Sequence, residues 1–96
     1  MVEIRKTDVF DSWLSNLRDR QARTRINIRI DRLALGNRGD AKSVGGGVSE
    51  LRIDYGTGYR VYFTRHGNTL IVLLAGGDKR TQDRDIQIAR KLAGQL

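Results

Sequence analysis

Glycines divide this chain into short segments, because they gather at residues 36–39, 45–47, 56–58, 67 and 76–77. Glycine marks turns and loops, so helices and strands of ordinary length must fit between these positions. No proline, internal repeat or low-complexity linker interrupts the segments. A chain of 96 residues supports one modest core, and we therefore expect a single domain over residues 1–96.

Helical periodicity dominates the first third of the sequence. Residues 2–7 alternate weakly and predict a strand. A short helix over residues 8–18 follows, capped by Thr7 or Asp8, with inward apolar side chains at Phe10, Trp13, Leu14 and Leu17. A second helix is expected from about Asp19 to Leu35, with an apolar stripe of Ala22, Ile26, Ile30 and Leu33. The two helices predict a hairpin that packs one face on a sheet.

The period changes from helix to strand in the second half. Residues 36–47 have the composition of a loop, whereas residues 48–55 and 59–64 alternate between apolar and polar side chains. The run at 69–75 is continuously apolar, which is typical of a strand buried on both faces. A last helix begins at Thr81 or Asp83, with an inner side formed by Ile86, Ala89, Leu92, Ala93 and Leu96. The order β-α-α-β-β-β-α predicts an α+β fold, a helical hairpin packed on a small antiparallel sheet.

The two predicted turns fix the register of these strands. A hairpin centred on Gly56 pairs Leu51 with Val61 on the core face and places Arg52 directly across from Arg60. Like charges that face each other on a sheet are destabilising, so an anion is expected beside them. Glu50 or Asp54 is the internal alternative to a bound ligand. A second hairpin, centred on Gly67-Asn68, places Ala75 opposite Arg60.

The charge of the chain indicates an anionic partner. Lys and Arg number 18 against 11 Asp and Glu, which gives a net charge of +7. Such an excess favours nucleic acid or an acidic protein segment, although a basic surface also aids solubility alone. The sequence has no cysteine and one histidine, so we expect no metal site and no cofactor. It also lacks a secretory signal and a membrane span, which predicts a cytoplasmic protein.

Four basic residues from three separate segments are expected at one end of the sheet: Arg52, Arg60, Lys79 and Arg80. Lys79 and Arg80 precede a helix, whose first backbone N–H groups also attract anions. The alternative is ordinary ion pairing with Glu50, Asp78 and Asp83. Further nucleic-acid contacts are expected from Lys42 in the loop and from a stripe of Arg25, Arg29 and Arg32, which otherwise forms solvated surface. His66 lies at the far hairpin tip, about 20 Å from Arg60, and is not a candidate base.

The stretches ELRIDYGTGYRVYF (50–63) and LIVLLAGGDKRTQDRDI (70–86) resemble the RelE/ParE toxin superfamily, and within it the HigB-like branch of addiction-module killer proteins. The segments WLSNLRD (13–19), RINIRIDRL (25–33) and GNRGDAKSVGGGVSELRI (36–53) are similar to the same branch. The resemblance covers nearly the whole chain. It implies the same α+β fold and the toxin of a type II toxin–antitoxin system.

The resemblance implies a ribosome-dependent endoribonuclease that cleaves messenger RNA and so inhibits translation. ParE-like members instead inhibit DNA gyrase, and an inactive co-repressor that only binds antitoxin is a third possibility. The implied partners are a helix-turn-helix antitoxin, the ribosome and its messenger, and operator DNA through the antitoxin. By resemblance Arg60 clamps the scissile phosphate, Lys79 and Arg80 stabilise charge or protonate the leaving oxygen, and Arg52 joins them.

Two positions depart from the nuclease pattern. RelE-like members carry a catalytic tyrosine on the final helix, where this chain has Ile86, and a lysine where it has Glu50. The residues left as a general base are Tyr62, Glu50, Asp78 and Lys79.

Overall fold

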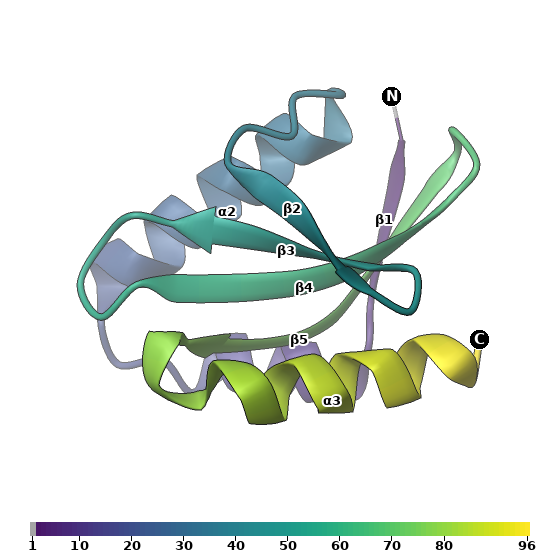
Figure 1. Ribbon diagram of the computed structural model, residues 1–96. Helices are drawn as coiled ribbons and strands as arrows, with labels where there is room; N and C mark the ends of the chain where they lie inside the picture. Colours follow the sequence, from purple (N-terminus) through teal and green to yellow (C-terminus); the bar gives the residue numbers. More distant parts are fainter. Residues whose placement is uncertain (1) are drawn as a thin grey trace.

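A computed structural model describes residues 2–96 and shows one sheet covered by helices on both faces (Figure 1). The elements in chain order are β1 (Glu3–Lys6), α1 (Asp8–Ser15), α2 (Arg20–Ala34), β2 (Ala41–Gly45), β3 (Val48–Ile53), β4 (Tyr59–His66), β5 (Leu70–Asp78), a 3-10 turn (Lys79–Thr81) and α3 (Gln82–Gly94). The predicted α+β class is confirmed. Within residues 2–96 no helix is both long and apolar enough to cross a bilayer.

The sheet has five strands in the order β1-β5-β4-β3-β2. The predicted antiparallel pairing is confirmed for β3, β4 and β5, and β2 is also antiparallel to β3, whereas β1, for which no partner was predicted, runs parallel to β5 at one edge of the sheet. The prediction of a loop over residues 36–47 is also wrong in part, because Ala41–Gly45 forms β2 on the other edge. Gly45, Gly46 and Gly47 all have positive φ, and Gly46 and Gly47 form the turn into β3. This glycine-rich turn gave the segment its loop composition.

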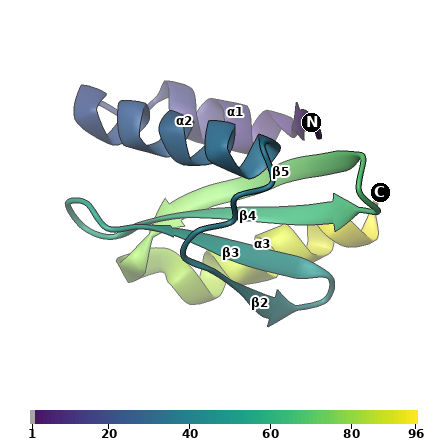
Figure 2. The ribbon, with the colours of Figure 1, turned by 90° about the horizontal axis from the view of Figure 1, so that it is seen from above.

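Both faces of the sheet are buried, which divides the core into two layers (Figure 2). Phe10, Ile26 and Leu33 of α1 and α2 pack on one face against a set of strand residues that includes Leu51, Val61 and Phe63. On the other face α3 covers a smaller cluster of Val48, Tyr62, Val72, Leu74, Ala75 and Ala89. Alternation along residues 48–55 and 59–64 identified only the first layer, whereas the apolar run at 69–75 and the inner side of the last helix indicated the second. Leu96, expected on the inner side of α3, is instead exposed.

Caps fix where the two N-terminal helices begin. Thr7 accepts a hydrogen bond from the Phe10 amide at 3.1 Å and donates one to the Leu74 carbonyl at 2.6 Å, which attaches the start of α1 to β5. Asp19 caps α2 by accepting from the amides of Gln21 and Ala22. Helix α1 ends at Ser15, earlier than the predicted residue 18, because residues 16–19 form the connection to the α2 cap.

Strand β5 is longer than predicted, because Gly76 and Gly77 lie within it. A Cβ atom at Gly76 would lie 2.1 Å from Cε3 of Trp13, and one at Gly77 would lie 1.8 Å from Oδ2 of Asp85. These glycines therefore allow α1 and α3 to approach the strand from its two sides. The longer strand carries the chain to Asp78 and delivers Lys79 to the end of the sheet.

Candidate functional site

The pairing of β3 with β4 places two arginines side by side. Arg52 is opposite Arg60 and Leu51 is opposite Val61, so the predicted register is confirmed. The predicted pairing of Ala75 with Arg60 is wrong, because Ala75 lies opposite Tyr62 and Gly77 lies opposite Arg60. There are two causes: next to the turn His66 pairs with Leu70, so the hairpin is centred on Asn68, and an irregularity in the ladder between Tyr62 and Phe63 shifts the register once more.

Three of the four predicted cations line a groove of about 370 Å³ at this end of the sheet, which we call the basic groove. Its lining residues are Asp40, Arg52, Ile53, Asp54, Gly58, Arg60 and Lys79. Arg80 does not line it. The Arg80 guanidinium turns back on Asp78, with Nη2 at 2.8 Å from Oδ2, and its side chain is largely exposed. The structure thus brings together Arg52, Arg60 and Lys79.

Arg60 is the most recessed of these cations. Its side chain is 12% exposed, and its Nε lies 4.0 Å from Oε1 of Glu50, which is completely buried. The internal anion anticipated from the register is therefore Glu50 for Arg60. Arg52 pairs with a different acid, Asp40, through Nε at 3.3 Å and Nη2 at 3.2 Å. Lys79 has no ion pair within residues 2–96.

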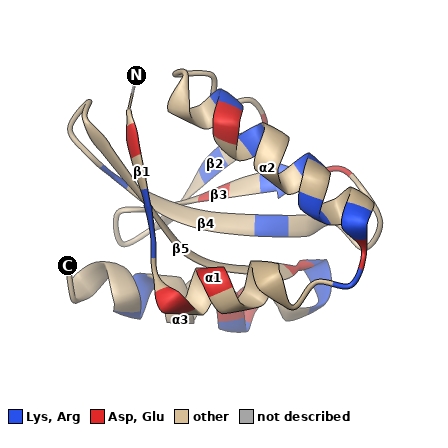
Figure 3. Cartoon of the chain, turned by 180° about the vertical axis from the view of Figure 1, so that it is seen from behind, with Lys and Arg blue, Asp and Glu red and all other residues tan. Residues whose placement is uncertain are grey.

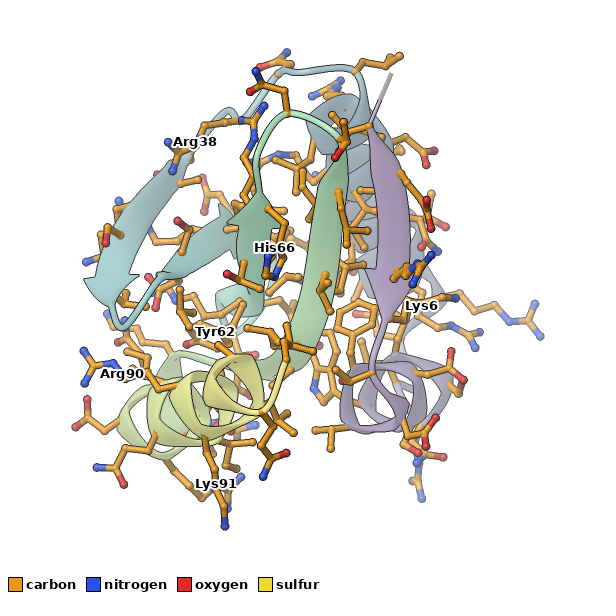
Figure 4. All side chains as sticks on the ribbon, turned by 90° about the vertical axis from the view of Figure 1, so that its right-hand side faces the viewer. Lys6, Arg38, Tyr62, His66, Arg90 and Lys91 are labelled. Atoms are coloured by element: carbon orange, nitrogen blue, oxygen red, sulfur yellow. The ribbon has the colours of Figure 1, made fainter. Side chains whose placement is uncertain are left out.

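Two of the residues predicted as possible general bases, Tyr62 and Asp78, are poorly suited to accept a proton. Tyr62 lies between the sheet and α3 (Figure 4), and burial, followed by the charge of Glu50, raises its pKa far above the ordinary value of 10.0. Tyr62 is therefore neutral at physiological pH, and its hydroxyl donates a hydrogen bond to Oε2 of Glu50 at 3.2 Å. The hydrogen bond from the Arg80 side chain lowers the pKa of Asp78 and makes this carboxylate a weak base.

A second groove of about 580 Å³ runs along α2 on the opposite side of β3, and we call it the arginine groove. It is lined by Arg20, Gln21, Thr24, Arg25, Ile28, Arg29, Arg32, Ile53 and Asp54, so it contains the whole predicted stripe. In Figure 3 most of the charged residues on α2 are basic (blue), whereas those on α1 are acidic (red). Ile53 and Asp54 line both grooves. Lys42, on edge strand β2, lines neither.

Two of the stripe arginines have internal partners. Arg25 lies over the ring of Tyr55, 4.7 Å from its centroid. Arg29 donates from Nη1 to the carbonyl of Arg52 at 2.6 Å and from Nη2 to that of Arg38 at 3.3 Å. Arg29 thereby holds in place the strand that carries Arg52. Arg20 and Arg32 form no ion pair within residues 2–96 and remain open to a ligand.

Arg29→Ala is expected to lower the free energy of unfolding by about 2 kcal/mol, because two carbonyls lose a charged donor. Arg32→Ala, on the same helix and without an internal partner, should change it by less than about 0.5 kcal/mol. Urea denaturation of both variants measures the difference. Equal stabilities would show that the Arg29 contacts contribute nothing.

Sequence reasoning missed two residues of the site. Asp40 was not predicted as a partner of Arg52, because residues 36–47 were expected to form a loop. The pairing of β2 with β3 brings Asp40 next to Arg52. Gln82 carried no signal of its own, yet its Nε2 donates to Oε2 of Glu50 at 2.8 Å. Within residues 2–96 no group of three or more His, Cys, Asp or Glu side chains is placed to hold a metal ion.

Comparison with known proteins shows similarity to one family and to a bacterial relative. Residues 12–93 match the family described as "Phage derived protein Gp49-like (DUF891)". An uncharacterised protein of Haemophilus influenzae is 54% identical over 95 residues, which cover 99% of this chain and 96% of the relative.

Proposed function

This chain belongs to the phage-derived Gp49-like family, and we propose that it is a type II toxin that cleaves messenger RNA on the ribosome. The family is associated with the toxins of toxin–antitoxin systems, so an antitoxin is the expected partner. The activity that we propose within this family is the HigB-like one, exerted in the cytoplasm. The proposed antitoxin has a helix-turn-helix fold and also links the toxin to operator DNA. The single observation that supports it best is the basic groove.

The basic groove offers positively charged side chains that can stabilise the phosphate during RNA cleavage. The ribose 2′-oxygen attacks the adjacent phosphorus, the bond from phosphorus to the 5′-oxygen breaks, and a cyclic phosphate and a 5′-hydroxyl result. The attacking hydroxyl must lose a proton, the leaving oxygen must gain one, and the phosphorane carries extra negative charge. Arg60 and Arg52 are assigned to the phosphate oxygens, since a guanidinium group binds two such oxygens through two parallel hydrogen bonds. Lys79 is assigned to the leaving oxygen.

A pair of adjacent lysine and arginine variants tests this assignment. Lys79→Ala should slow cleavage roughly tenfold or more, because one charge-assisted contact to the transition state is lost. Arg80→Ala removes the same net charge from a residue outside the groove and should change the rate less than about twofold. Cleavage rates of ribosome-bound messenger decide between them. Equal losses would mean that the effect is general electrostatics.

Asp54 is our candidate for accepting the 2′-hydroxyl proton. It lines the basic groove, and its carboxylate has no ion pair or hydrogen bond within residues 2–96. Asp54→Asn keeps the shape but cannot take the proton, and cleavage should fall by about 10²-fold, the lower end for a base exposed to solvent. Binding of an uncleavable 2′-deoxy substrate should persist. An unchanged cleavage rate would remove Asp54 from the mechanism.

The arginine groove is proposed as a secondary contact with nucleic acid through Arg32, with Arg25 and Arg29 beside it and Lys42 at the sheet edge. Because exposed phosphate contacts are salt-dependent, Arg32 should contribute to affinity and not to the rate of the chemical step. The RNA affinity of Arg32→Ala at two salt concentrations measures this share. An unchanged salt dependence would leave the stripe as solvated surface.

A second candidate function is non-enzymatic inhibition of gyrase. It is favoured by Ile86, which packs against the cluster under α3, at the position where RelE-like members carry a catalytic tyrosine. Expression of the chain alone in cells, with mapping of messenger 5′ ends, separates the possibilities. New ends confined to translated regions support the nuclease. Growth arrest without new ends, together with inhibited supercoiling, supports the gyrase inhibitor, and normal growth supports a chain that only binds antitoxin.

A further inference from the structure

Glu50 is an unusual residue for the interior of this sheet. It has no solvent exposure and lies on the face covered by α3, beside Tyr62 and Arg60. Burying a carboxylate in such a position carries a large desolvation cost, which only hydrogen-bond donors and a nearby cation can offset. An apolar side chain of similar size would avoid that cost. The residues around Glu50 therefore indicate what its charge does.

Two donors fix one oxygen of this carboxylate and leave the other for Arg60. Oε2 accepts from the Tyr62 hydroxyl at 3.2 Å and from the Gln82 amide at 2.8 Å. Oε1 faces Nε of Arg60 at 4.0 Å, and within residues 2–96 neither atom has a hydrogen-bond partner. The pair is thus an electrostatic contact that a small movement of Arg60 would convert into a hydrogen bond.

Asp85, the other buried carboxylate nearby, does not take this role. Its Oδ2 accepts from the Thr81 hydroxyl at 2.5 Å, and its Oδ1 lies 3.7 Å from Nε of Arg84. Asp40 is likewise occupied by Arg52. Within residues 2–96 Glu50 is the one acid paired with Arg60.

We propose that Glu50 is a positioning residue for Arg60, which it orients through Nε so that both Nη groups are presented to a phosphate in the basic groove. This inference rests on the proposed function of that groove as a phosphate site. The carboxylate also neutralises part of the guanidinium charge. Glu50 therefore orients Arg60 but lowers its affinity for the phosphate of the bound RNA. Gln82, the first residue of α3, completes the arrangement and ties the orientation of Arg60 to the start of that helix.

A positioning role predicts that binding and cleavage respond in opposite directions to Glu50→Gln. The amide keeps the shape but loses the charge, so Arg60 attracts phosphate more strongly and is held less well. The affinity for an uncleavable 2′-deoxy oligonucleotide should rise by about twofold or more, from the larger net positive charge. Cleavage of ribosome-bound messenger should fall by about tenfold or more. A purely structural role for Glu50 would lower both in proportion to lost stability.

The experiment combines these two measurements with NMR of the Arg60 Nε–Hε group in the intact chain. Glu50→Gln should shift that resonance and produce the split between affinity and rate. A parallel fall in both, or no change in either, overturns the proposal. If Glu50→Gln does not fold, Tyr62→Phe and Gln82→Ala each remove one donor to Oε2 and keep both charges. The Arg60 resonance should then move, and an unmoved resonance also overturns the proposal.

The proposed nuclease function is contradicted, independently of the role of Glu50, if the wild-type chain binds the oligonucleotide but does not cleave ribosome-bound messenger. In that event the affinity change and the Arg60 resonance still decide whether Glu50 positions Arg60. An opposite result, with wild-type cleavage intact and Glu50→Gln fully active, rejects the positioning role and leaves the nuclease assignment standing.

Discussion

Gly77→Ala is expected to lower the free energy of unfolding by about 3 kcal/mol or more, or to prevent folding. The new Cβ would lie 1.8 Å from Oδ2 of Asp85 and 2.8 Å from its Cγ, far inside contact distance. Asp85 has little room to withdraw, because it is buried and holds the Thr81 hydroxyl. Relief would require α3 to move away from β5.

Gly94→Ala is the matched control for this substitution. Gly94 ends α3, and a Cβ there would meet nothing within 4 Å. Alanine favours helix over glycine, so Gly94→Ala should be neutral or stabilise the chain by up to about 1 kcal/mol. Thermal and urea unfolding of the two variants measure the contrast. If Gly77→Ala were as stable as Gly94→Ala, the close packing of α3 on β5 would be wrong.

Arg60→Ala is expected to slow messenger cleavage by roughly 10²- to 10³-fold, because a positioned donor to the transition-state charge is lost. It also leaves Glu50 buried without its cation, and breaking such a pair costs up to about 3–5 kcal/mol. The 4.0 Å separation without a hydrogen bond places this pair toward the lower end. The alanine variant alone could therefore lose activity by unfolding.

Arg60→Lys separates the two effects. Lysine keeps the charge beside Glu50, so the fold should persist, but it cannot bind phosphate through two parallel donors. Activity should still fall by about tenfold or more. Arg65→Ala, at the exposed end of the same strand, removes one positive charge away from the groove and should remain active. Circular dichroism and cleavage rates of the three variants test this, and a fully active Arg60→Lys would contradict the clamp.

The pairing of β3 with β4, which brings Arg52 beside Arg60, could be predicted from the sequence. The residues around Gly56 paired Arg52 with Arg60 as expected, because both strands alternate and the turn is short. The pairing of β4 with β5 could not be predicted, since the turn is centred on Asn68 and the irregularity after Tyr62 leaves no mark in the sequence. Arg80 was placed in the site by its neighbourhood in sequence, whereas its side chain binds Asp78.

Burial on the second face of the sheet was predicted for residues 69–75, but not for the polar side chains of β3 and β4. Glu50 and Tyr62 alternate with core residues and so were expected on the opposite face, yet both are completely buried there, under α3. A glutamate in a strand gives no sign of whether it is solvated or buried. Only the packing of α3 shows that Glu50 lies under the groove, where its charge acts on Arg60.

The central claim, that the basic groove cleaves messenger on the ribosome, is tested most directly with purified protein. Messenger RNA in a translating ribosome complex and the same messenger free in solution are incubated with the wild-type chain and with Arg60→Lys, and new 5′ ends are mapped. We predict cuts within the ribosome-bound reading frame, none in free messenger, and a strong loss in Arg60→Lys. Intact ribosome-bound messenger, in the presence of a folded wild-type chain that arrests growth in cells, would contradict the claim.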